Sequence, residues 1–271
     1  MERRDFLNLA AVTPFAASSL VNAAIASSES KIFILVHGTW LGGWIWQDVA
    51  QALRKMGHRV FTPTLTGVGE RHHLTNPDIG LGTHINDIVG VIDYEELSDV
   101  ILIGHSFSGM AITGAADVRK EKIRHIGFFE ALIPHEGRMT AVEMNADGSE
   151  TEKFRERRSR FLDGYQMVFW DDYPIEMLVG NEYPKVRAKL RKLLTPHPAD
   201  AWTDKLILKN GGWRDLPRTY LRGTKQEFAP SSIKMWGPAK QPGWDWIDVP
   251  VGRMGMMTHP EIMASAFAKL S

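Results

Sequence analysis

A serine between small residues is the feature of the chain that most directly suggests chemistry. The apolar run Val100-Ile-Leu-Ile103 leads straight into Gly104-His-Ser106-Phe-Ser108-Gly109. A buried strand, a tight turn and a helix start form the setting of a nucleophile elbow, in which the turn lifts a serine hydroxyl clear of the sheet edge. Ser108 takes the place of the second glycine of the G-x-S-x-G pattern and is small enough for the turn to form. We therefore predict that Ser106 is a nucleophile; the alternative is a serine at an ordinary helix cap.

Two backbone donors are expected beside this serine. Phe107 begins the next helix and offers its N–H, while Thr39 lies in the His37-Gly38-Thr39 turn after the first apolar strand. Two N–H groups aimed at one point form an oxyanion hole, and each donor contributes about 3 kcal/mol to acyl transfer. His37 is expected to pack beneath its turn, and the side chain of His105 is expected to point away from the site.

The elements that must position these residues alternate between strands and helices. Strand-like apolar runs, typical of strands buried on both faces, occur at 31–36, 59–62, 100–103, 123–129, 219–222 and 246–249. Helical spacing of apolar residues occurs at 45–56, 84–94, 110–118 and 262–270. This alternation predicts an α/β fold with a mainly parallel sheet and right-handed crossovers.

One segment, at 137–215, interrupts the alternation. It carries charge runs, aromatic residues and several prolines, and it has no strand of the buried kind. We interpret it as a helical cap inserted between two sheet strands, within a single domain that spans 31–271.

Composition narrows the classes of function. The chain has 271 residues and is 44% hydrophobic, which suffices for a large core and excludes a disordered protein. Lys+Arg 32 balance Asp+Glu 32, so nucleic acid is not the expected partner. The absence of cysteine excludes disulfides, thiolate metal sites and a cysteine nucleophile. His72, His73 and His84 fit no strong metal-binding spacing. The expected partner is a small molecule, and the aromatic residues of the cap suggest that it has an apolar or aromatic moiety.

Residues 1–26 have the features of an export signal. Arg3-Arg4 precedes a weakly apolar run that ends in Ala24-Ile25-Ala26, a pattern that resembles the bacterial twin-arginine signal. Pro14 disfavours a stable span, and no other segment has about 18 uninterrupted apolar residues. We expect cleavage near Ala26 and a periplasmic or secreted protein without a membrane span; the alternative is an uncleaved tail on a cytoplasmic enzyme.

Several motifs carry a resemblance to a known family. They are Phe-Ile-Leu-Val-His-Gly-Thr-Trp-Leu-Gly-Gly-Trp-Ile-Trp at 33–46, Pro-Thr-Leu-Thr-Gly-Val-Gly-Glu-Arg at 63–71, Gly-His-Ser-Phe-Ser-Gly-Met at 104–110, Thr-Pro-His-Pro at 195–198 and Met-Thr-His-Pro-Glu at 257–261. The chain resembles the α/β-hydrolase superfamily, and within it the small bacterial esterases akin to plant methyl esterases and hydroxynitrile lyases. The resemblance implies an eight-stranded, mostly parallel sheet, a helical cap, no cofactor and a Ser–His–acid triad.

The chain departs from that triad at the histidine. Where the family has a Gly-His-Asp-x-Met segment, this chain reads Gly252-Arg-Met-Gly-Met256, so Arg253 stands at the position of the base. An arginine cannot act as a general base because it stays protonated and has no lone pair to offer. His259 is the candidate replacement, but Thr258 and Glu261 have the spacing of a capping box, which would place His259 at the surface in the first turn of the last helix.

The acid of the triad has two candidates. Glu130 ends the strand at 123–129, where the branch has an acidic residue, and Glu227 follows the strand at 219–222, with Gln226 at the position of the commoner aspartate. We favour Glu130. Either carboxylate can instead be a solvated or capping group.

Three functions are compatible with these residues. The first is a serine hydrolase for a small ester, lactone or related acyl substrate, with an altered triad. The second is a lyase or isomerase in which the oxyanion site or Arg253 grips an anionic intermediate, although Gly38 and Met254 depart from the hydroxynitrile lyase pattern. The third is a binding protein that has lost catalysis. Fold alone does not decide function, but we rank the hydrolase first.

Overall fold

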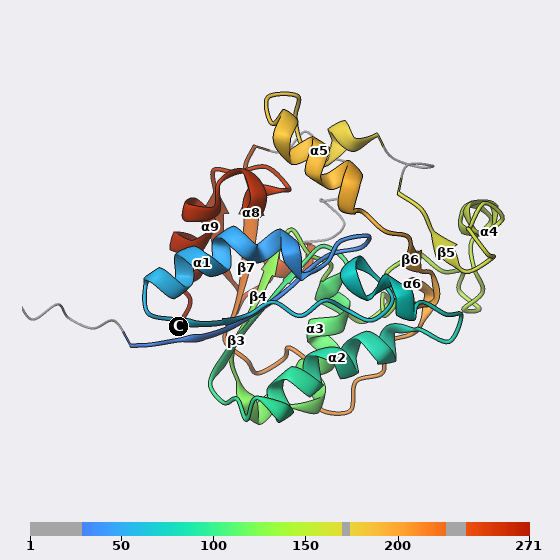
Figure 1. Cartoon of the computed structure of the whole chain (residues 1–271). Coiled ribbons are helices and arrows are strands. Elements are labelled where there is room, and N and C mark those ends of the chain that lie inside the picture. The colour runs from blue at the N-terminus through green and yellow to red at the C-terminus, as the bar shows by residue number, and fades with distance from the viewer. Residues whose placement is uncertain (1–28, 170–173, 226–236) are drawn as a thin grey trace, which may run out of the picture.

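A computed structural model describes residues 29–169, 174–225 and 237–271 of the chain. Its centre is a six-stranded, all-parallel sheet with the strand order β2-β1-β3-β4-β7-β8 (Figure 1). The strands are β1 (Ile32–Val36), β2 (Arg59–Phe61), β3 (Val100–His105), β4 (Ile123–Phe129), β7 (Arg218–Gly223) and β8 (Asp245–Val249). An α/β fold with a parallel sheet is therefore confirmed.

Helices cover both faces of this sheet. The longer ones are α1 (Gln47–Lys55), α2 (Leu81–Tyr94), α3 (Ser108–Val118) and α9 (Pro260–Phe267). Phe33 and Leu35 of β1 pack with α1 and α9, whereas Ile34 and Val36 pack with α2 and α3. Because successive residues of a strand point to opposite faces, this division gives one apolar core on each side of the sheet. Short helical turns complete the connections: η1 (Gly43–Trp46), η2 (Gly69–Leu74), η3 (Lys120–Lys122), η5 (Gly237–Lys240) and α8 (Gly255–Thr258).

The sheet is smaller than the resemblance implies. Six strands, rather than eight, are present in the described residues, and they are the six that the apolar runs predict. Outside 137–215, the described connections between these strands are helices, helical turns and loops, so they offer no further extended run that could pair with an edge.

The segment between β4 and β7 holds mostly short helices. They are α4 (Glu152–Arg158), η4 (Ile175–Met177), α5 (Pro184–Leu193) and α6 (Asp200–Thr203). The segment also contains a two-stranded antiparallel pair, β5 (Gln166–Met167) with β6 (His197–Pro198), which is too short to give a periodic signal in the sequence. In Figure 1 these elements gather on the upper right of the molecule. We refer to this segment as the cap.

Two predictions fall outside the described residues: the export signal at 1–26 and the alternative acid Glu227. Within the described ranges, no helix combines the length and the apolar character that crossing a membrane requires.

Candidate active site

Ser106 lies in a sharp turn between β3 and α3. Its backbone has φ 59, a left-handed conformation that non-glycine residues rarely adopt and that is typical of strained functional turns. Gly38, in the turn after β1, comes so close that a Cβ added there would lie 2.8 Å from the Cβ of Ser106. Ser108 ties the turn to β1, because its hydroxyl accepts a hydrogen bond from the backbone N–H of His105 (2.8 Å) and lies 3.0 Å from the carbonyl of Val36. The sequence therefore forms the expected elbow, with Ser108 stabilising it.

The strained conformation recurs along the same edge of the sheet. Trp40 after β1 has φ 64, and Glu130 after β4 has φ 47. A left-handed residue other than glycine costs roughly 1–2 kcal/mol, and three of the seven such residues in the described part of the chain follow three adjacent strands at this edge.

The two expected oxyanion donors flank Ser106. Among the hydrogen bonds of the described residues, none is donated by the backbone N–H of Thr39 or of Phe107. The side chain of Thr39 is held from the cap, since the indole N–H of Trp202 donates to its Oγ1 over 3.1 Å. The ring of Trp202 also stacks on that of Phe107, with 6.1 Å between centroids and an interplanar angle of 5°. One cap residue thus contacts both donor positions.

Arg253 reaches Ser106 from the loop after β8. Its Nη2 donates a hydrogen bond to the hydroxyl oxygen of Ser106 over 2.5 Å, and the side chain is only partly buried. The register of the Gly252-Arg-Met-Gly-Met256 segment predicts that Arg253 lies beside Ser106. A charged donor to a hydroxyl forms a stronger hydrogen bond than a neutral one and favours the ionised oxygen.

Glu130 is buried at the end of β4, beside the end of β7. Its Oε1 accepts a hydrogen bond from the backbone N–H of Gly223 over 2.7 Å. Glu130 and Arg253 both lie near the buried hydroxyl of Tyr220: burial raises the pKa of Tyr220 well above its usual value, the charge of Glu130 adds to the rise and Arg253 opposes it. The carboxylate and the guanidinium therefore occupy the same end of the sheet.

The buried histidines do not serve Ser106. His37 is satisfied, as expected, since its Nδ1 contacts the carbonyl of Gly38 (2.8 Å) and its Nε2 accepts from the N–H of Leu65 (3.0 Å). Burial lowers the pKa of His37 to about 3. His105 packs between the rings of Trp46 and Phe129, beside Gly38, and burial together with the charge of Arg253 lowers its pKa well below the usual range.

Two further buried histidines, His84 and His197, lie against Phe107 on the cap side of the elbow. Their rings are 5.3 Å apart, centroid to centroid, and each makes an edge-to-face contact with the ring of Phe107. Burial lowers the pKa of His84 to about 4 and that of His197 well below its usual range. Both rings are therefore neutral near pH 7.

His259 is not brought to Ser106. Its Nδ1 contacts Thr258 Oγ1 (2.9 Å), and its Nε2 lies 3.4 Å from the hydroxyl of Tyr183 in the cap. The expected capping box is wrong, because Thr258 ends α8 and its hydroxyl donates to the carbonyl of Met254 (3.3 Å), which leaves His259 as the N-cap residue of α9. His259 is half-buried rather than at the surface. Within the described part of the chain, no hydrogen bond links an imidazole to Ser106.

A cavity of about 80 Å³ lies on the side of Arg253 where the cap meets the C-terminal loop. Arg253, Tyr183 and His259 contribute to its lining.

Sequence reasoning missed Tyr183 and Trp202 as individual residues, because both contact the site only through the packing of the cap. As for metals, the described ranges hold no group of three or more His, Asp or Glu side chains arranged to bind an ion.

Comparisons with known proteins agree with this architecture. A model of the Alpha/beta hydrolase family matches residues 33–266. The carbendazim hydrolyzing esterase of Nocardioides sp. (strain SG-4G) is 36% identical over 246 residues, which cover 88% of this chain and 98% of the relative. Esterase PIR7B of Oryza sativa subsp. japonica is 24% identical over 244 residues, which cover 82% of this chain and 88% of the relative.

A solved structure is also similar. It is described as an extracellular alpha/beta-hydrolase from Paenibacillus species that shares structural and functional homology with Tobacco Salicylic Acid Binding Protein 2. The likeness has a TM-score of 0.74 and 26% sequence identity, and it covers 89% of this chain and 99% of that one. The relatives are named esterases and hydrolases, so this protein is an enzyme of the hydrolase class. The chain belongs to the α/β-hydrolase family.

Proposed function

We propose that the protein hydrolyses a small ester, lactone or related acyl substrate through Ser106, with Arg253 in place of the usual imidazole. The observation that carries the proposal is the hydrogen bond from Arg253 Nη2 to Ser106 Oγ at the elbow. The guanidinium occupies an acceptor position of the oxygen and leaves the hydroxyl proton free to depart. Its positive charge lowers the pKa of the serine hydroxyl and so raises the fraction of alkoxide.

The reaction then follows acyl transfer without a protein base. The alkoxide of Ser106, formed by loss of its proton to water or hydroxide, attacks the carbonyl carbon. The N–H groups of Thr39 and Phe107 bind the resulting oxyanion. The C–O bond to the leaving group breaks, the alcohol takes a proton from solvent, and water hydrolyses the acyl-enzyme. Glu130 is the acidic member of this altered triad; it is buried, and its charge and that of Arg253 both act on Tyr220.

Aromatic rings above the elbow favour a substrate with an apolar or aromatic moiety. Trp40 packs edge-to-face against Phe169 with 5.1 Å between centroids, and Trp202 stacks on Phe107. These rings come from the turn after β1, the cap and the elbow itself. Apolar and aromatic side chains are the usual surroundings of a small-molecule site.

The test compares the protein with Ser106→Ala on short-chain p-nitrophenyl esters and on carbendazim, the compound named for the Nocardioides relative. We expect turnover that is lost in Ser106→Ala and retained in Ser98→Ala, a matched change at an exposed serine. A fluorophosphonate should label Ser106, as read by mass spectrometry of the peptides. Full turnover by Ser106→Ala would refute the assignment of the nucleophile.

One observation also favours a second function. The guanidinium beside Ser106 can hold an anionic carbon–carbon lyase or isomerase intermediate as readily as an alkoxide. In that case substrate is consumed while Ser106 forms no acyl-enzyme and labels slowly. Ligand binding without any turnover would instead support a protein that has lost catalysis.

We also propose export to the periplasm or the medium, with cleavage near Ala26. The support is the Arg3-Arg4 pair ahead of a weakly apolar run with small residues at its end. N-terminal sequencing of the protein from its native host tests this. An intact Met1 or Glu2 in the cytoplasmic fraction would refute export and leave the catalytic proposal untouched.

A further inference from the structure

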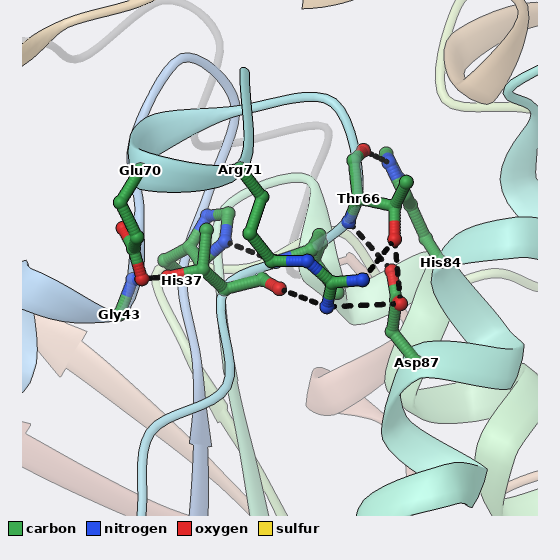
Figure 2. Close-up of polar contacts among 9 residues, drawn as sticks. His37, Gly43, Thr66, Glu70, Arg71, His84 and Asp87 are labelled. Carbon is green, nitrogen blue, oxygen red and sulfur yellow. Dashed lines mark hydrogen bonds and ion pairs between the residues drawn. The ribbon is translucent and has the colours of Figure 1, made fainter. Parts of the chain in front are cut away.

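The loop between β2 and α2 contains a closed group of polar contacts that catalysis does not use directly. Asp87 of α2 accepts hydrogen bonds from the backbone N–H of Thr66 (2.6 Å) and from its hydroxyl (2.7 Å). Arg71 donates to the same hydroxyl (2.7 Å) and forms an ion pair with Asp87 (3.2 Å). Figure 2 shows the three side chains converging, and we call Thr66, Arg71 and Asp87 the clamp. Asp87 is largely buried, with 10% of its side chain exposed, so solvent screens these contacts only in part.

Two neighbouring groups hold the clamp from other sides. Arg71 also donates to the carbonyl of Thr64 over 3.0 Å. The ring of His84 meets the carbonyl of Thr66 through Nε2 over 3.0 Å (Figure 2). A carbonyl only accepts, so Nε2 carries the proton and donates. The backbone from residue 64 to residue 66 is thereby fixed at both carbonyls and at one N–H.

The fixed segment bears directly on the turn that carries Thr39. Between the two clamped residues lies Leu65, whose N–H donates to Nε2 of His37 over 3.0 Å. That bond requires an unprotonated Nε2 and hence a proton on Nδ1, which donates to the carbonyl of Gly38 (2.8 Å). The chain of contacts therefore runs from the clamp through Leu65 and His37 to the backbone immediately before Thr39.

A second set of contacts attaches the same loop to the same turn. The hydroxyl of Thr64 accepts from the N–H of Gly43 (2.7 Å) and donates to Glu70 (2.5 Å) (Figure 2). From the cap, Thr195 accepts from the N–H of Gly69 (2.8 Å) and donates its own N–H to the carbonyl of Trp40 (3.1 Å). The turn from residue 37 to residue 43 is thus held along its length by the loop that the clamp anchors.

We propose that the clamp of Thr66, Arg71 and Asp87 positions the oxyanion turn, a role that rests on the proposed hydrolase function. Its members are positioning residues, because they act through Leu65 and His37 and touch no reacting atom. An oxyanion donor helps only when it lies within hydrogen-bond reach of the developing charge. A loosened clamp lets the turn shift, and a shift of about 1 Å at a reacting centre can cost a factor of about 100 in rate.

The kinetic test is Asp87→Asn, with Asp78→Asn as the control. Asp78 is an exposed aspartate of the same loop, so the control removes the same charge without touching the clamp. We expect kcat on a p-nitrophenyl ester to fall about 10- to 100-fold in Asp87→Asn. KM should change by less than about twofold, because ground-state binding does not use the oxyanion donors. Binding of a trifluoromethyl ketone, which forms a tetrahedral adduct at the serine, should weaken in parallel with kcat.

A second pair of variants guards against a folding defect. Thr66→Val keeps the shape of the side chain and removes its hydroxyl, whereas Thr66→Ser keeps the hydroxyl. A positioning role predicts a fall in kcat for Thr66→Val and recovery in Thr66→Ser, at equal melting temperatures. The proposal is overturned if kcat per fluorophosphonate-labelled Ser106 stays within about twofold of wild type in both Asp87→Asn and Thr66→Val, or if only KM changes.

A measurement that needs no turnover separates this proposal from the proposed function. Hydrogen exchange of the Leu65 amide reports its bond to His37. We expect exchange at least tenfold faster in Asp87→Asn than in Asp78→Asn, together with a change in the ¹⁵N shifts of the His37 ring. Unchanged exchange overturns the clamp even in an active enzyme. Faster exchange in a protein without ester turnover supports the clamp and refutes the hydrolase.

Discussion

Replacing Arg253 by methionine tests the central feature of the site. The change keeps a long side chain and removes the charge that donates to Ser106 over 2.5 Å. A hydrogen bond to a charged group contributes roughly 1.5–3 kcal/mol, and one pKa unit corresponds to about 1.4 kcal/mol. Because Arg253 is only partly buried, solvent takes up part of this energy. We therefore expect the arginine to lower the pKa of the serine hydroxyl by about one to two units.

The assay follows from that magnitude. Fluorophosphonate labelling of Ser106 measures nucleophilicity without any assumption about the substrate. At pH 8, Arg253→Met should label about 10- to 100-fold more slowly than wild type, since the alkoxide fraction falls with each pKa unit. Arg214→Met, at an exposed arginine, should label at the wild-type rate.

The pH dependence supplies the refuting result. Without an imidazole partner, the wild-type labelling rate should rise steadily through pH 6–9 instead of levelling above the usual histidine pKa of about 6.5. A plateau set by a group near that value would show that a histidine serves Ser106 after all. Equal labelling rates of Arg253→Met and wild type would show that the contact has no part in activation.

Two further substitutions at this edge of the sheet and one change of pH give the remaining predictions. Arg253→His should raise ester turnover and add an acidic limb to its pH profile, because an imidazole there can accept the proton of the nucleophile; no gain in turnover would mean that the position cannot orient a base. Gly38→Ala should abolish most turnover and lower the free energy of unfolding by roughly 1–3 kcal/mol, because the new Cβ would lie 2.8 Å from the Cβ of Ser106. The control Gly82→Ala, whose new Cβ would meet no atom within 4 Å, should change neither quantity. Urea unfolding and a turnover assay measure both effects. Acid should destabilise the fold: the pKa values of His37 and His84, about 3 and about 4, lie below the ordinary 6.5, so the unfolded chain binds more protons. The free energy of unfolding should then fall as pH drops from 6.5 towards 4, by up to about 1.4 kcal/mol per pH unit for each histidine, and equal urea midpoints at pH 7.5 and 5 would contradict this.

The sequence predicts the sheet well because each strand corresponds to a continuous apolar run of neighbouring residues. Each of the six apolar runs becomes a strand within one or two residues of its expected ends, for example 100–103 against Val100–His105. The contact of Arg253 with Ser106 follows from motif register alone, because the end of β8 and the elbow meet at the same edge of a parallel sheet.

The missed features depend on tertiary packing. Thr258 and Glu261 have the spacing of a capping box. However, the hydroxyl of Thr258 donates to the carbonyl of Met254, and Thr258 ends the short helix α8 instead of starting α9. The clamp joins a loop to the side of α2, and Thr66 and Asp87 show no periodic relation in the sequence. Local propensity carries no information on such contacts, which form only when the elements pack.

The left-handed backbone of Ser106 has a consequence for the evolution of this enzyme. Glycine adopts a φ of 59° at no steric cost, whereas the Cβ of a serine makes this conformation strained. A chain with glycine at this position would relieve that strain and, on the proposed mechanism, would also be inert. The residue proposed as the nucleophile is thus one that selection for a robust fold alone would replace. Natural drift without a demand for activity should erode this position early, and libraries screened only for thermal tolerance should be enriched in the inactive glycine form.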